Sequence, residues 1–268
     1  MILMQIFKKG SFVFWLIIIQ SLSLHAQENQ DLDAHTLIER MDLEQLHAAL
    51  DFESNLDLDG GNNSDYLSSL NFEIAQRHFA NFMDSGNEET LLLVMDFAES
   101  ALDYEISDTS KRIDQLLFIG EIYYELRYFD VYDLRAFQKF SEVVNLDPDD
   151  RYTSLIYMDL AELLGVPNFA FEHMNYLLVN DTEWFLEELG EKFIIIASAS
   201  GKIDQSIEAL GWIEFQSVLS GEPLPDRFPL LSAGLHLMND DRVSAQSEMD
   251  RYTGSADDDF YRALQERL

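Results

Sequence analysis

The chain has 268 residues, of which 47% are hydrophobic and 12% aromatic, and its 50 acidic against 17 basic residues give a formal net charge of −33. This apolar content is enough to bury a large core, so the acidity does not indicate disorder. Because a phosphate backbone has to be met by clustered lysine and arginine, the charge excludes nucleic acid as a partner, and the absence of cysteine excludes disulfides.

Residues 1–26 have the layout of a secretory signal peptide. Lys8 and Lys9 precede an apolar run over 12–19, and the segment ends at Ala26 before polar residues. That run is too short for a comfortable membrane span. We therefore expect cleavage after Ala26 and a periplasmic or secreted protein without stable membrane insertion. An uncleaved anchor is the alternative. Cleavage removes two lysines, leaving 15 basic residues and a net charge of −35.

The acidic segment 55–65 is a candidate calcium loop. Asp57 and Asp59 stand at alternate positions before a glycine, as at the start of a loop that curls around one hard cation. The closing bidentate acid should fall where Tyr66 stands, whereas Asp65 is one place early. We assign no metal to the chain, and both a solvated acidic turn and a bound calcium ion stay open for this segment.

Beyond this loop, apolar residues recur at the spacing of one helical face in five segments, each interrupted by a turn. These segments are 75–105, 116–148, 151–184, 187–217 and 230–252. In the clearest, 151–184, the turn at 165–168 separates two apolar stripes that neither helix can bury alone. Short turns make the two helices antiparallel, and neighbouring hairpins must cover the rest. We predict an all-α fold of about eleven helices, an α-solenoid of antiparallel helical hairpins.

The C-terminal part contains a bend and a terminal helix. Residues 220–229 contain three of the five prolines, all of which fall at predicted helix breaks. The terminal helix within 257–268 has Ser255 as a candidate N-cap and aspartates at its positive end. The predicted organisation is a signal peptide over 1–26, a helical repeat region over 27–219, the bend over 220–229, and a C-terminal hairpin with a capping helix over 230–268.

The hairpins resemble the tetratricopeptide repeat family, whose unit is two helices in about 34 residues. The family's small residues and turn glycine match, in the two clearest segments, Gly120, Ala136, Ala161, Gly165 and Ala170. The resemblance implies a right-handed superhelix that acts as a non-catalytic interaction scaffold or adaptor. An ordinary α-helical domain is the alternative.

The same resemblance implies which side chains face a concave groove. These are Asp114, Leu117, Glu121, Tyr124 and Glu125, followed by Tyr152, Leu155, Asp159 and Glu162. The mixture of aromatic and acidic residues favours a protein or peptide partner that carries positive charge. The alternative is a solvated helix face.

No pattern points to catalysis. The histidines lack zinc-ligand spacing, and the sequence has no glycine-rich phosphate loop or serine elbow. His173 is better explained by the packing face of its helix. We assign no catalytic residue and no cofactor. Two other functions stay open: an enzyme on a helical scaffold, for example one that cleaves glycans, and a calcium-stabilised surface module. The acidity is equally explained by solubility or adaptation to salt.

Overall fold

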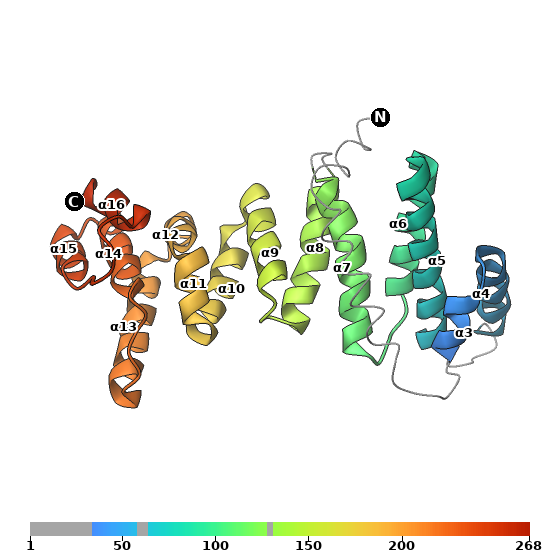
Figure 1. Ribbon diagram of the computed structural model, residues 1–268, viewed down its shortest axis with the longest axis horizontal. Coiled ribbons are helices and arrows are strands. Elements are labelled where there is room, and N and C mark those ends of the chain that lie inside the picture. The colour runs from blue at the N-terminus through green and yellow to red at the C-terminus, as the bar shows by residue number, and fades with distance from the viewer. Residues whose placement is uncertain (1–33, 58–63, 128–130) are drawn as a thin grey trace. The chain divides into compact units, whose positions relative to one another are not determined.

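The computed structural model describes residues 34–57, 64–127 and 131–268, and within these ranges it contains helices and no strands (Figure 1). The predicted all-α fold is confirmed. The fourteen described helices exceed the eleven expected, because a short helix such as that at 182–188 is hard to separate from its neighbours by periodicity. None of the helices in the described ranges is long and apolar enough to span a membrane. The predicted signal peptide lies outside these ranges.

The chain forms two compact units that divide between Asp147 and Pro148. Unit 1 contains α3 (Ala34–Arg40), α4 (Leu43–Asp57), α5 (Ser64–Ser85), α6 (Glu88–Leu102), α7 (Thr109–Glu125) and α8 (Tyr132–Leu146). Unit 2 contains α9 (Arg151–Leu163), α10 (Pro167–Asn180), α11 (Thr182–Glu188), α12 (Gly190–Ala199), α13 (Ile203–Ser220), α14 (Phe228–Met238), α15 (Arg242–Met249) and α16 (Asp259–Gln265). The prolines lie either in the first turn of a helix or in the segments between helices, where the missing backbone N–H costs least.

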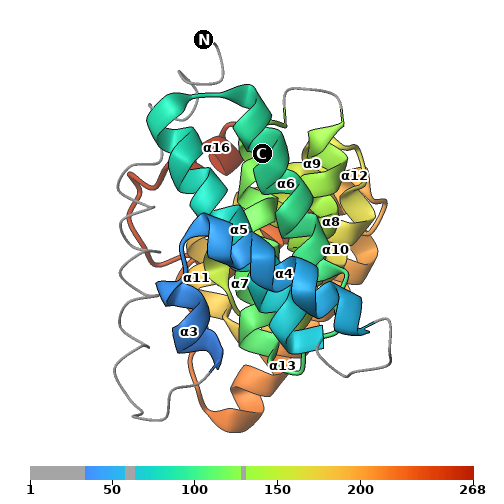
Figure 2. The ribbon, with the colours of Figure 1, turned by 90° about the vertical axis from the view of Figure 1, so that its right-hand side faces the viewer.

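Unit 1 is built from the hairpins α5–α6 and α7–α8, with α3 and α4 packed against α5 (Figure 2). The α5–α6 turn reverses at Gly86, whose φ of +66° favours glycine. In the α7–α8 hairpin, a Cβ added to Gly120 would lie 3.2 Å from the Cβ of Lys139. A small residue at position 120 therefore lets these two helices approach closely.

Polar contacts, one buried and one partly buried, join the helices of unit 1. The Ser68 hydroxyl donates to the Ala101 carbonyl at 2.8 Å and accepts from Gln115 Nε2 at 2.8 Å, which connects α5, α6 and α7. The Tyr123 hydroxyl donates to Glu99 at 2.7 Å, and Lys139 binds the other oxygen of this carboxylate at 2.6 Å. Glu99 is on α6, Tyr123 on α7 and Lys139 on α8, so these contacts connect the α5–α6 hairpin to the α7–α8 hairpin. Each of these polar groups would be costly to bury without a partner.

Unit 2 contains an aromatic cluster where α10, α11 and α12 meet. The rings of Phe171 and Phe193 are stacked with centroids 5.6 Å apart, and Phe185 meets Phe193 edge-on at 5.4 Å. All three side chains are buried. Where α14 packs against α12, a Cβ at Gly234 would lie 2.2 Å from Ile194 Cδ1, so a larger residue at position 234 would force the Ile194 side chain to move.

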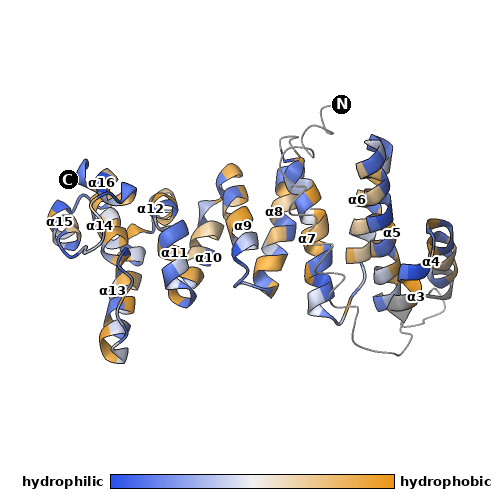
Figure 3. Cartoon of the chain, in the orientation of Figure 1, coloured by the Kyte–Doolittle hydropathy of each residue, from blue (hydrophilic) through white to orange (hydrophobic). Residues whose placement is uncertain are grey.

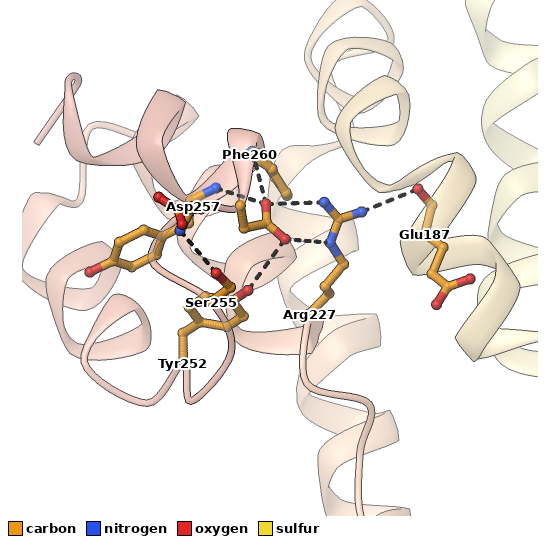
Figure 4. A network of polar contacts seen from close by, with 8 residues as sticks. Glu187, Arg227, Tyr252, Ser255, Asp257 and Phe260 are labelled. Atoms are coloured by element: carbon orange, nitrogen blue, oxygen red, sulfur yellow. Dashed lines mark hydrogen bonds and ion pairs between the residues drawn. The ribbon is translucent and has the colours of Figure 1, made fainter.

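The C-terminal end of unit 2 is held by Arg227, which precedes α14 (Figure 4). Its guanidinium donates twice to the Asp258 carboxylate, at 3.0 Å each, and once to the Glu187 carbonyl at the end of α11, at 3.2 Å. The Tyr252 hydroxyl also contacts Asp258, at 3.3 Å. This bidentate pair links three parts of the chain through one side chain.

Asp258 is also the N-cap of α16, and the prediction of Ser255 as this cap is wrong. The Asp258 carboxylate accepts from the backbone N–H groups of Phe260 and Tyr261 at 2.9 and 3.2 Å. Since α16 starts at residue 259, only position 258 can reach these unpaired donors. Ser255 accepts instead from the N–H of Asp257, inside the preceding turn.

Replacing Asp258 by alanine should lower the unfolding free energy of unit 2 by about 2–4 kcal/mol, because it removes a helix cap and leaves the Arg227 guanidinium without its carboxylate. Chemical denaturation followed by tryptophan fluorescence measures this loss, since Trp184 and Trp212 both lie in unit 2. Asp257→Asn is the matched control and should change stability by less than about 0.5 kcal/mol. Equal effects of the two substitutions would contradict the assigned role of Asp258.

Candidate functional site

Helix α7 carries the five candidate residues of unit 1. Its start is fixed by Asp108, whose carboxylate accepts from the N–H groups of Ser110 and Lys111. The candidates differ in exposure along the helix: Asp114 is exposed, Leu117, Tyr124 and Glu125 are half-buried, and Glu121 is buried. The structure therefore brings these residues onto one helix without giving them one common solvent-exposed surface.

The ring of Tyr124 already holds a cation of the chain itself. The Arg127 guanidinium lies 3.9 Å from the ring centroid and donates to the Tyr124 carbonyl at 2.7 Å. The edge of the same ring meets Phe140 of α8 at 6.2 Å. Arginine over an aromatic face is a favourable arrangement of charge and ring quadrupole, so a cationic ligand would have to displace Arg127 to use this face.

Glu121 differs from the exposed carboxylate that the groove hypothesis expected. Only 8% of the residue is exposed. Burial, together with the neighbouring charge of Glu125, raises the pKa of Glu121 to about 8. At neutral pH this side chain is therefore mostly protonated, and it can offer a hydrogen bond but little negative charge.

Helix α9 carries the candidate residues of unit 2. Tyr152 and Leu155 are 39% and 38% exposed, and Asp159 and Glu162 are exposed further along the same helix. Their spacing places the four side chains along one side of α9. We call this set the α9 face. Unlike the candidates of α7, all four are open to solvent.

Lys192 of α12 binds both acids of the α9 face. Its ammonium pairs with Asp159 and lies 3.3 Å from Glu162. Burial opposes the charge on Lys192, but the hydrogen bonds and charges of the two carboxylates outweigh it and raise the pKa of Lys192. Lys192 was not predicted from the sequence, because helical periodicity does not indicate which residue of another helix will meet a surface acid.

The opposite side of α9 is fixed to α10 by a buried pair. Ser154 Oγ lies 2.8 Å from His173 Nε2 and also donates to the Asp150 carbonyl at 2.8 Å. His173 is stacked on Tyr176 and is only 7% exposed, which confirms its predicted packing role. Burial lowers the pKa of His173 to about 4. The pair therefore positions α9 with a neutral imidazole.

A shallow polar depression in unit 2 was not anticipated. It is lined by Asp149, Tyr176, Leu177, Asn180 and Asp181, with a volume of about 250 Å³. Its polar groups are already engaged: the Tyr176 hydroxyl donates to Asp149 at 2.8 Å, and Asp181 pairs with Arg151 at 2.7 Å. Its lining residues come from the loop before α9 and from the end of α10. No single sequence pattern predicts that these two segments lie together.

The candidate calcium loop falls largely on residues outside the described ranges. Asp65, at its end, is described and accepts from the N–H and hydroxyl of Ser107 at 3.1 and 2.9 Å. Across the ranges that the structure describes, no three histidine, aspartate or glutamate side chains are grouped so as to hold a metal ion.

No protein-family model matches this chain, and no curated protein shows significant similarity to it.

Glu121→Gln should stabilise unit 1 at high pH and change little at low pH. Because the pKa of Glu121 rises from 4.5 unfolded to about 8 folded, the stability that its protonated form contributes is complete below pH 4.5 and is lost as pH rises to 8. The loss is on the order of 3–5 kcal/mol. Hydrogen exchange of the α7 amides at pH 5 and pH 9 measures this loss. The control is Glu105→Gln, which removes an exposed carboxylate from the loop before α7. A gain at pH 9 no larger than at pH 5 would contradict the burial of an ionisable group.

His173 should give unit 2 the opposite response to acid. Its pKa falls from 6.5 unfolded to about 4 folded, so its contribution is complete above pH 6.5 and is lost as pH falls to 4, by about 2–4 kcal/mol. His173→Gln, which keeps a hydrogen-bonding group beside Ser154 but cannot titrate, should flatten this dependence. Tryptophan fluorescence during urea unfolding at pH 4.5 and 7 tests it, and an unchanged pH dependence in the variant would refute it.

Proposed function

We propose that this chain is a non-catalytic interaction protein of the periplasm or extracellular space, built from tetratricopeptide-like hairpins, and that the α9 face binds a basic segment of another protein. The observation that carries the proposal is the Lys192 ammonium, held by two carboxylates at one end of the α9 face. An internal lysine there occupies the place that a ligand lysine would take. The adjoining Tyr152 and Leu155 offer exposed apolar area.

The spacing on α9 suggests what such a ligand looks like. Residues 152 and 155 lie about seven positions before the acids at 159 and 162, which corresponds to about 10 Å along a helix. An extended peptide covers this distance with about three residues. The ligand would therefore place an apolar side chain about three residues from a lysine or arginine. The apolar group supplies buried area and the cation supplies orientation.

Helix α7 supports a second contact of similar chemistry. Leu117 and Tyr124 are half-buried apolar groups, and Asp114 and Glu125 are acids on the same helix. Because Glu121 is mostly neutral at pH 7, it would contribute a hydrogen bond rather than charge. A ligand at α7 would also compete with Arg127 for the ring of Tyr124.

The test uses a fluorescein-labelled peptide set with one leucine and one lysine at varied separations. Asp159→Asn combined with Glu162→Gln should weaken binding of the best peptide about tenfold, as loss of two charged contacts predicts. Lys192→Ala should strengthen it several-fold, because the internal competitor is gone. Fluorescence anisotropy measures both, and each variant is checked for unchanged unfolding.

Lys202→Ala is the matched control, since it removes the same charge from an exposed position elsewhere in unit 2. If Lys192→Ala and Lys202→Ala change the affinity equally, net charge alone explains the effect and the α9 face is not the site. Weaker binding after Lys192→Ala would also contradict the proposal, because the lysine would then help rather than compete.

A further inference from the structure

Helix α13 exposes a row of large apolar side chains that unit 2 does not cover. The row consists of Trp212, Phe215, Val218 and Leu219, with 60%, 51%, 75% and 64% of each residue exposed. Their spacing places all four along one side of the helix. We call this set the α13 stripe. Its two rings contact each other at 5.8 Å between centroids.

The stripe lies on the part of α13 that contributes nothing to the core. Only Ser206 and Leu210 of this helix are buried, and both are in its first half. The second half extends beyond the other helices of unit 2 (Figures 1 and 2), and its apolar end is visible in Figure 3. Polar residues would serve the fold equally well at these positions, so an apolar patch here indicates an interaction site.

This end of α13 is held in place rather than loose. Gly221 ends the helix with a φ of +74°, and the Ser217 hydroxyl donates to the Glu222 carbonyl at 2.6 Å. On its flank, Glu214 pairs with Arg251, which follows α15 and also binds Glu248 at 2.8 Å. A ligand would therefore meet a preformed surface and lose little free energy to ordering it.

The charged residues of α13 itself are all acidic, and the flanking Arg251 is already paired with Glu214 and Glu248. Asp204, Glu208 and Glu222 are exposed, and α13 contains no lysine or arginine. Glu208 lies on the same side of the helix, about one turn before Trp212 and two turns before Phe215. A partner that covers the stripe therefore gains by placing positive charge at its rim.

The same charges disfavour two other occupants. A second copy paired in parallel would bring Glu208 against itself, and an antiparallel pairing centred on Phe215 would bring Glu208 toward Glu222. Each copy also carries a net charge of −33. An anionic lipid surface would be repelled for the same reason.

We propose that the α13 stripe binds an amphipathic helix of another protein, with an apolar face against Trp212, Phe215, Val218 and Leu219 and with lysine or arginine along its edges. This second surface is independent of the α9 face. A chain with both surfaces would join two partners, or two segments of one partner.

The experiment uses two synthetic helical peptides with the same leucine face, one flanked by lysines and one by glutamates. Fluorescence anisotropy should show binding of the lysine peptide, at least tenfold weaker binding of the glutamate peptide, and weaker binding of the lysine peptide in high salt. Trp212→Ser with Phe215→Ser should weaken the lysine peptide at least tenfold. Val243→Ser, which removes an isolated side chain from a residue that is 82% exposed on α15, should leave the affinity unchanged.

Three results would overturn the proposal. Equal binding of the lysine peptide to the double variant would show attraction by net charge alone. A parent dimer in sedimentation velocity that the double variant abolishes would identify a second copy as the occupant. Binding to phosphatidylcholine vesicles that depends on the stripe would identify a membrane. Asp159→Asn with Glu162→Gln should leave the affinity for the lysine peptide unchanged. The α13 proposal can therefore fail while the α9 proposal holds, and the reverse.

Discussion

The fold depends on one constraint: an apolar stripe on a helix must be covered, and a single partner helix does not cover it. In both units the remaining apolar surface of a hairpin is covered by further helices. In unit 1, α7 packs against both α6 and α8. In unit 2, α12 packs against α10 on one side and against α14 on another. Side chains at these contacts must be small or well matched, as Gly120 and Gly234 illustrate.

This close packing determines which polar groups can be buried. Ser68 and Ser154 are buried, and each meets a partner from a neighbouring helix, so they add connections between helices at little cost of desolvation. Glu121 and His173 are buried too, and each is kept neutral by burial. To stay neutral on folding, a carboxyl has to keep a proton, whereas an imidazole has to lose one. The same physical cause therefore gives the two units opposite responses to pH.

Much of the fold could be predicted because local signals set where helices begin and end. Gly165 takes the left-handed conformation after α9, and Pro167 stands at the start of α10. The contacts between helices could not be predicted in this way. Lys192 meets Asp159, and Arg227 meets Asp258, across more than 30 residues of sequence. Such pairs depend on how hairpins pack, which the apolar spacing of one helix does not specify.

The candidate site shows the same division. The resemblance to a repeat family placed Tyr152 and Asp159 on one side of α9, whereas helical periodicity could not show that Glu121 of α7 is buried. It also could not distinguish the buried stripe of a core helix from the exposed stripe of α13, since both have the same spacing. Only the packing of unit 2 reveals that Trp212 is left outside the core.

Selection of a random peptide library on the folded protein tests the binding function most directly, with depletion on the Asp159→Asn, Glu162→Gln variant. The predicted result is enrichment of peptides that carry an apolar residue about three positions from a lysine or arginine, lost on the variant. Enrichment of a different motif, or the same peptides on the variant, would contradict a basic-segment site on α9.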